Sequence, residues 1–207
     1  MNNRPGSPHR QWPVLLCALL LCACIAPNLS APTLHTLPTE QPQPISQAFA
    51  AFDQMVLLMP VRVAPYLEGR GLVTSAETGA TTSSPSHIWA GPLDQQIGRR
   101  IVTDLQGLLA TDNVALYPAP RFATIRYQVE VEINELSGDG RTFTTTAVYT
   151  LSDTAAKTVL ARKTFRQSQV MEQADPATAV ACTARGISAL SREIATALVS
   201  AHQENRR

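Results

Sequence analysis

The sequence is poor in aromatic and charged residues, and this excludes some classes of protein. Aromatic residues make up 5% and charged residues 16% of its 207 positions, and the formal net charge is only +1. Proteins that bind nucleic acid carry a basic stripe or patch, whereas the arginines here are scattered and have acidic residues among them. We therefore expect no nucleic-acid partner.

The residue groupings that carry enzyme chemistry are also missing. The sequence has no glycine-rich phosphate loop, nucleophile elbow or Ser-x-x-Lys arrangement. His35, His87 and His202 have no ligand spacing to one another or to a cysteine, so a zinc site has no support. Glu130 and Glu132 share a face at strand spacing, where a solvated surface explains them. We predict a protein that is not an enzyme, with no catalytic residue, metal or cofactor.

The apolar run near the N-terminus, Val14 to Ala23, is too short to cross a membrane, because a transmembrane helix needs about 20 apolar residues. Arg4 and Arg10 precede it. A short apolar run behind a basic start is typical of an export signal. We predict that residues 1–23 are a signal peptide and are removed.

The segment Leu21-Cys22-Ala23-Cys24 resembles the lipobox of bacterial lipoproteins, which has an aliphatic residue, then a small residue, before the acylated cysteine. This predicts cleavage before Cys24 and lipid on its thiol. An ordinary secretory signal cut nearby is the alternative. Enteric lipoproteins that stay on the inner membrane have Asp after the cysteine, and Ile25 stands there instead. The resemblance therefore implies a lipid-anchored protein on the periplasmic face of the outer membrane.

Cysteine is almost absent from the predicted mature chain. Cys17 and Cys22 leave with the signal and Cys24 carries lipid, so only Cys182 remains and no intrachain disulfide is expected. A lone thiol inside a predicted helix is most simply a small buried residue. Cleavage also removes two arginines, which leaves 15 Lys and Arg against 16 Asp and Glu and a net charge near −1.

A proline-rich segment precedes the part of the chain that we expect to fold. Residues 24–52 are rich in proline, with Gln, Thr and Ser between and no apolar period, and we predict a lipidated tether there. Within it, Thr33 to Leu37 is a candidate edge strand. Residues 53–202 are predicted to form a single domain, and residues 203–207 a polar tail.

The first half of this domain is predicted to contain short strands. The apolar run Met55 to Val63 favours a strand buried on both faces, with a bulge or a sheet edge at Pro60. Leu72-Val73 and His87 to Trp89 are predicted to pair as a hairpin around a Gly/Thr/Ser loop. A further short strand is expected at 114–117.

The second half alternates apolar and polar residues, from Ile125 to Asn134 and again from Arg141 to Leu151. Because a turn signal, Gly138-Asp139-Gly140, separates the two segments, they predict an antiparallel hairpin with one buried face. Thr158 to Phe165 is expected to add a third antiparallel strand.

Two amphipathic helices are predicted to cover this sheet. Apolar residues recur at helical spacing from Leu93 to Leu109, and Arg100 and Asp104 are assigned to the opposite, polar face. The second helix begins at Asp175-Pro176 and continues to Leu198. The predicted fold is α+β: an antiparallel sheet of about four to six strands with two amphipathic helices packed on one face.

Three ordered elements indicate a family. They are a Pro-x-Tyr-Leu-like element at the end of Pro60 to Leu67, Trp89-Ala90-Gly91-Pro92-Leu93 opening a helix, and Ser188-Ala189-Leu190-Ser191 in the last helix. With the lipobox and tether, they resemble the PqiC-like lipoproteins, the auxiliary lipoprotein component of ABC-type transport systems, over roughly residues 34–200. The sequence departs from that family at Leu34 to Leu37, which replaces a Tyr-x-Leu start, and at Gly91, where glutamate is frequent.

The resemblance implies a non-enzymatic accessory role in lipid transport between the two membranes. Its expected partners are a mammalian-cell-entry (MCE) domain protein and an inner-membrane permease. Two alternatives stay open: an activator or scaffold for a cell-envelope enzyme, and a carrier that holds lipid in an apolar cavity. The carrier would need unfilled space beside side chains such as Leu105, Val129, Val131 and Leu190.

The region from Tyr66 to Trp89 is the candidate contact with a partner, since its Gly/Thr/Ser-rich connection cannot form core and loops carry recognition. Tyr66 and Trp89 are the candidate binding residues. For Trp89 the alternative is a packing residue at the helix entry. Self-association into a ring or a smaller oligomer is a further expectation, because one small domain cannot enclose a lipid path.

Overall fold

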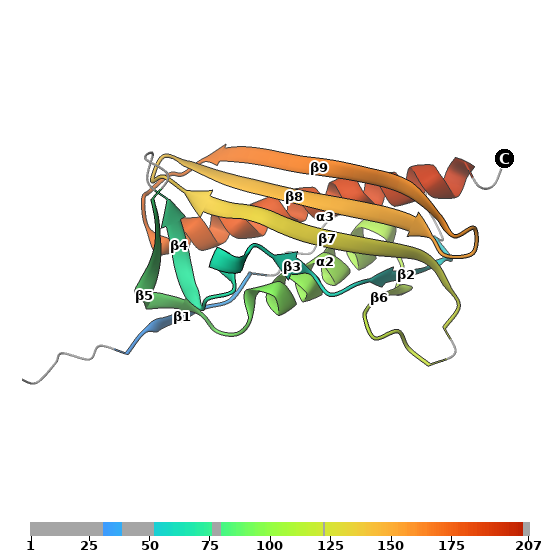
Figure 1. Cartoon of the computed structure of the whole chain (residues 1–207), viewed down its shortest axis with the longest axis horizontal. Helices are drawn as coiled ribbons and strands as arrows, with labels where there is room; N and C mark the ends of the chain where they lie inside the picture. Colours follow the sequence, from blue (N-terminus) through green and yellow to red (C-terminus); the bar gives the residue numbers. More distant parts are fainter. Residues whose placement is uncertain (1–30, 39–51, 76–79, 122, 205–207) are drawn as a thin grey trace, which may run out of the picture. The chain divides into compact units, whose positions relative to one another are not determined.

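The computed structural model describes residues 31–38, 52–75, 80–121 and 123–204, and those from Pro32 onward form one compact unit (Figure 1). The predicted signal peptide, Cys24 and most of the predicted tether lie outside the described residues. Among the helices of the described residues, none combines the length and the apolar character needed to span a membrane.

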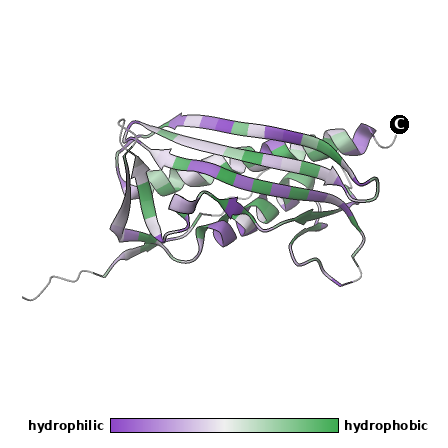
Figure 2. Cartoon of the chain, in the orientation of Figure 1, coloured by the Kyte–Doolittle hydropathy of each residue, from purple (hydrophilic) through white to green (hydrophobic). Residues whose placement is uncertain are grey.

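The core of the larger sheet is three long antiparallel strands: β7 (Ile125–Gly138), β8 (Thr142–Asp153) and β9 (Thr158–Val170). Buried side chains alternate with partly exposed ones along β7 and β8, which confirms the predicted hairpin and its register. The alternation is visible as coloured bands in Figure 2. β9 continues beyond its predicted end at Phe165.

The predicted α+β fold, with two helices and a sheet of about six strands, is confirmed, but the sheet is mixed and not purely antiparallel. β2 (Met55–Leu58) pairs in parallel with both β6 (Val114–Leu116) and β7, and β3 (Arg62–Val63) also runs parallel to β7. The strand order is β6-β2-β7-β8-β9, with β3 beside β7. Pro60 lies where the predicted continuous strand divides into β2 and β3, because proline cannot donate a ladder hydrogen bond. β2 is buried on both faces, as predicted.

Two helices, α2 (Leu93–Leu109) and α3 (Pro176–Glu204), lie on the same side of this sheet (Figure 1). α3 packs along β7, β8 and β9, and α2 packs against α3, β3 and β6. Their apolar faces and the inner face of the sheet form one core. Leu105, Val129, Val131 and Leu190 all belong to this core and are at most 2% exposed.

A second, three-stranded sheet has the order β1-β5-β4, from β1 (Thr33–His35), β5 (Thr81–Trp89) and β4 (Gly71–Ser75). β1 is an edge strand, as expected for that segment, and it pairs in parallel with β5. The β4–β5 hairpin confirms the predicted pairing, but strand β5 already begins at Thr81, inside the segment predicted to be loop. A 3-10 helix, η4 (Pro65–Leu67), connects β3 to this sheet.

Candidate partner-binding surface

Of the two predicted binding residues, Tyr66 is on the surface and Trp89 is in the core. Trp89 ends β5 and is 5% exposed, and its backbone N–H donates to the carbonyl of Arg70 at 2.7 Å. Its role in packing at the helix entry is therefore clear, since Leu93 of α2 follows and joins the same core. Tyr66 lies in η4 and is 41% exposed. Its hydroxyl donates to the carbonyl oxygen of Asn134 at 3.2 Å, and partial burial raises the pKa of its phenol.

A pocket of about 560 Å³ lies where the β4–β5 hairpin meets the β7–β8 turn and the start of α3. We call it the hairpin pocket. Leu72 and Pro85 come from the hairpin, Asp139 from the turn, and Met171 and Asp175 from the connection into α3. Its lining is mainly apolar and includes two carboxylates, Asp139 and Asp175, and such a composition is typical of pockets that bind ligands.

Two glycines allow the segments around the hairpin pocket to approach closely. A Cβ at Gly71 would lie 2.0 Å from Ser83 Oγ and 2.6 Å from the Ser84 carbonyl oxygen, so only glycine permits this hairpin. A Cβ at Gly138 would lie 2.7 Å from Met171 Sδ. The hairpin pocket thus depends on a close backbone contact at Gly71, whereas at Gly138 the neighbour is the flexible side chain of Met171.

The two carboxylates are fixed by backbone hydrogen bonds. Asp139 Oδ1 accepts the N–H groups of Arg141 and Thr142 at 2.8 and 2.7 Å. These bonds, led by that of Thr142, lower the pKa of Asp139, so it is ionised at neutral pH. Asp175 Oδ1 accepts the N–H of Thr178 at 2.7 Å and caps the first turn of α3. Both carboxylates of the pocket lining are thus held in fixed positions.

The pairing of β1 with β5 brings together two histidines that are far apart in sequence. His35 Nε2 and His87 Nδ1 are 3.1 Å apart, and the ring centroids are 5.4 Å apart. Within the residues that the structure describes, no three His, Cys, Asp or Glu side chains are grouped for metal binding. Sequence spacing missed this pair, because only the non-local parallel pairing of the two strands creates it.

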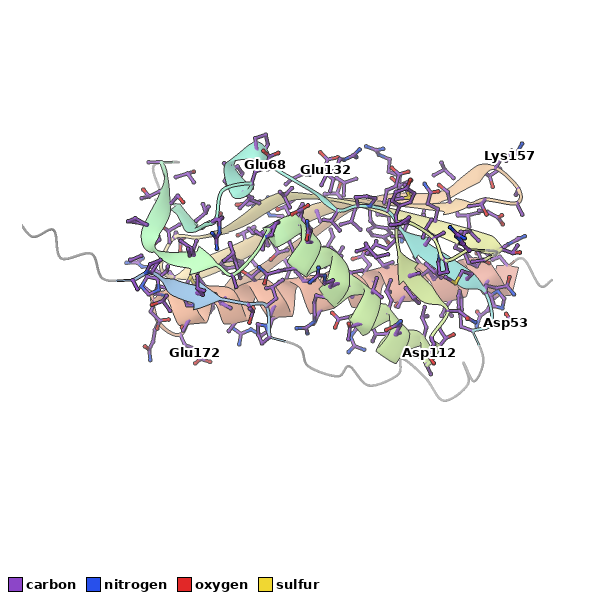
Figure 3. The ribbon with its side chains drawn as sticks, turned by 90° about the horizontal axis from the view of Figure 1, so that it is seen from below. Asp53, Glu68, Asp112, Glu132, Lys157 and Glu172 are labelled. Carbon is purple, nitrogen blue, oxygen red and sulfur yellow. The ribbon has the colours of Figure 1, made fainter. Side chains whose placement is uncertain are left out.

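The sequence analysis also considered Glu130, Glu132 and Cys182, and the structure shows the surroundings of each. Glu132 forms a salt bridge with Arg62 at 3.0 Å on the exposed face of the sheet, and Glu130 accepts a hydrogen bond from Gln128. Figure 3 shows Glu132 projecting on the sheet side of the molecule. Cys182 is a free, fully buried thiol on α3, as predicted.

A buried polar cluster joins the two helices. Arg100 Nε donates to Asp104 Oδ1 at 2.7 Å, and Arg100 Nη2 donates to Ser188 Oγ of α3 at 2.6 Å. Ser188 Oγ in turn donates to Asp104 Oδ2 at 3.1 Å. The side chains of Arg100 and Asp104 are only 3% and 1% exposed, so their assignment to a solvated face of the helix is wrong. We call these three residues the interhelix cluster.

Together these features define a class of protein: an α+β domain with a filled core, a helix-to-helix polar cluster and a surface pocket. The chain belongs to the family described as ABC-type transport auxiliary lipoprotein component, which it matches over residues 35–195. It is a PqiC-like lipoprotein of a family that is not a class of enzymes.

Relatives and solved structures agree with this assignment. The chain is 27% identical over 134 residues to the intermembrane transport lipoprotein PqiC of Escherichia coli, covering 64% of this chain and 69% of PqiC. PqiC of Shigella flexneri gives the same values. A crystal structure of a protein from Xanthomonas campestris has the same fold, with a TM-score of 0.71 at 15% identity, covering 84% of this chain and 99% of that one.

Proposed function

We propose that the protein is a non-enzymatic, lipid-anchored accessory component of an MCE-type intermembrane lipid transport system, held on the periplasmic face of the outer membrane. The observation that carries the proposal is the family match over residues 35–195, together with the similarity to a protein named as an intermembrane transport lipoprotein. An MCE-domain protein and an inner-membrane permease are the proposed partners.

The packing of the domain favours a docking role over a carrier role. The side chains that would line a lipid cavity, including Leu105, Val129 and Leu190, are buried against one another in a continuous core. The hairpin pocket is a half-open surface feature of about 560 Å³ instead. Such a pocket suits an inserted side chain or short segment of a partner better than the full length of a phospholipid.

Anchoring would make even a small contact effective. A lipid at Cys24 and the proline-rich segment after it would hold the domain near partners fixed in the opposite membrane. Tethering of this kind raises the local concentration of the domain without adding any contact. We propose the hairpin pocket and neighbouring Tyr66 as the surface that meets the MCE protein.

The proposal is tested by isolating the tagged full-length lipoprotein from detergent extracts of crosslinked envelopes. We expect an MCE-domain protein and its permease to be recovered with it. Recovery is expected to drop when Thr82, an exposed residue lining the hairpin pocket, is replaced by Trp, and to persist in the matched control Thr124→Trp, an exposed residue just before β7 that lines neither this pocket nor β9. Recovery of a peptidoglycan synthase in place of the MCE protein would favour the activator role, and recovery of the protein alone with bound phospholipid would favour the carrier.

A further inference from the structure

Strand β9 forms one edge of the larger sheet. Within the described residues it pairs only with β8, although it is 13 residues long. The outward backbone N–H and C=O groups of an edge strand are a template for another strand. β9 also carries apolar side chains that face water: Val159 is 64% and Leu160 38% exposed.

A groove of about 530 Å³ runs between β9 and α3; we call it the edge groove. Leu151 and Leu160 form part of its floor on the sheet side. On the helix side it is lined by small residues, among them Ala189, Ala197 and Ser200. Because these short side chains leave space beside the strand, a segment added to β9 could place side chains in the groove.

The charge along β9 has a single sign. Lys157, Arg162, Lys163 and Arg166 are all exposed, and no Asp or Glu occurs from 157 to 170. Strand alternation puts Arg162 and Arg166 on the outer face, while Lys163 lines the edge groove. Within the described residues, the side chains of Arg162, Lys163 and Arg166 form no salt bridge.

These charges determine which strand the edge can accept. Basic residues on an edge discourage pairing with a second copy of the same edge, because like charges opposite each other are destabilising. The edge groove is lined by two basic residues, Lys163 and Arg192, and by two acidic ones, Glu193 and Glu204, so its charges balance. The unbalanced positive charge lies on the outer face of β9, at Arg162 and Arg166.

We propose that β9 binds an extended acidic segment of a partner protein as an added strand. Acidic side chains on one face of that segment would lie beside Arg162 and Arg166, and apolar ones on its other face would enter the edge groove next to Leu160. Main-chain hydrogen bonds supply affinity in this mode of recognition, and the groove and charges supply specificity. The inference rests on the proposed function in one respect: the natural source of the segment is a component of the transport assembly.

Figure 1 places the β8–β9 turn and the C-terminus of α3 at the end of the sheet opposite the β4–β5 hairpin. Lys157 marks this turn in Figure 3. The edge groove is lined by residues of the C-terminal part of α3, as far as Glu204. It is thus a separate surface from the hairpin pocket, and its occupation would leave that pocket free.

The test uses the full-length lipoprotein in detergent and two labelled peptides as long as β9, one alternating Glu with Val and the other Lys with Val. We expect the acidic peptide to bind and to slow hydrogen exchange in β9 but not in β6, the opposite edge. Arg162→Glu/Lys163→Glu/Arg166→Glu should weaken its binding by about tenfold or more and favour the basic peptide. The matched control Arg99→Glu/Arg121→Glu changes exposed cations elsewhere and should bind as the wild type does.

A second pair of variants tests the groove. Ser200→Trp should fill the edge groove and weaken binding of the acidic peptide, whereas Gln203→Trp, also exposed on α3 but outside the lining, should not. Absence of acidic-peptide binding, equal binding by the triple variant, or protection on a strand other than β9 would overturn the inference.

The same measurements separate this inference from the proposed function. If the wild type recovers an MCE protein from envelopes but does not bind the acidic peptide, the β9 inference fails and the proposed function stands. If the wild type recovers no MCE protein, the proposed function fails, and the peptide measurements still decide whether β9 is a strand-accepting edge.

Discussion

At Arg100 a guanidinium group is held away from water between two helices. Burying an ion pair costs desolvation energy, and the Coulomb attraction offsets it only when further hydrogen bonds are made. Ser188 makes two such bonds here, since its hydroxyl contacts both Arg100 and Asp104, but Arg100 Nη1 is buried without a hydrogen-bond partner. The interhelix cluster is therefore not expected to add much net stability.

Asp104→Ala should be strongly destabilising, because it leaves the charge of Arg100 buried without its carboxylate. We expect a loss of about 3–5 kcal/mol in the free energy of unfolding, measured by urea denaturation. Asp112→Ala, which removes an exposed carboxylate just after the same helix, should stay within about 0.5 kcal/mol.

The double variant Arg100→Met/Asp104→Leu distinguishes the cluster from ordinary packing. Replacing both charges with apolar residues of similar volume should restore most of the lost stability. A double variant as unstable as Asp104→Ala would show that the loss comes from packing alone and would contradict this account.

The sequence did not reveal the interhelix cluster, and the reason is physical. Arg and Asp four positions apart on a helix are the usual composition of a solvated face. Only the position of Ser188, far along the chain on another helix, shows that this part of α2 is covered. By contrast, the burial of Cys182 could be predicted, because a lone thiol among helical apolar positions has few other uses.

At the scale of elements, α3 makes a close contact with β8 at Gly186. A Cβ at Gly186 would be 2.2 Å from Thr145 Oγ1 and 3.0 Å from Thr145 Cβ, and Thr145 is fully buried. Gly186→Ala should therefore push helix and sheet apart and cost about 1–3 kcal/mol, measured by thermal or urea unfolding. Gly69→Ala is the matched control, since nothing lies within 4 Å of the added methyl group; equal losses for the two variants would refute the close contact.

The register of β7 gives a second prediction at this scale. Val129 faces the core and pairs with Leu58 on one side and Leu151 on the other, whereas Glu130 lies on the opposite face. Val129→Asp should unfold the domain by burying a charge, and Glu130→Lys should change stability by about 0.5 kcal/mol or less. Circular dichroism and melting temperature measure both, and similar melting temperatures would rule out this register.

Elements set by local pattern were predictable and those set by distant pairing were not. The β7–β8 hairpin follows from alternation and a glycine turn, so its strands and buried face were predicted correctly. The parallel pairing of β2 with β6 and β7 joins segments far apart in sequence, and no local pattern reports it. The open edge of β9 was missed for the same reason, because an edge is a property of strand order.

At the scale of the whole molecule, attachment should depend on one residue. Cys24→Ser removes the thiol that the lipoprotein pathway acylates before cleavage, so we expect an unprocessed precursor without diacylglycerol. Mass spectrometry of the membrane fraction measures this, with Cys182→Ser as the control that keeps normal processing. A mature wild-type chain that begins elsewhere, or one without lipid at Cys24, would refute the assignment.

The parallel pairing of β2 also affects how the protein folds while it is being synthesised. Its apolar residues Val56, Leu57 and Leu58 are synthesised well before β6 and β7, the strands that cover their backbone edges. Until those strands exist, β2 is an unpaired apolar strand, and such segments are where chains associate wrongly. The later β7–β8 hairpin has short-range contacts and can pair early, whereas closing the sheet around β2 must wait for a long loop. The interval between making β2 and closing the sheet is therefore when this chain most needs protection from other chains.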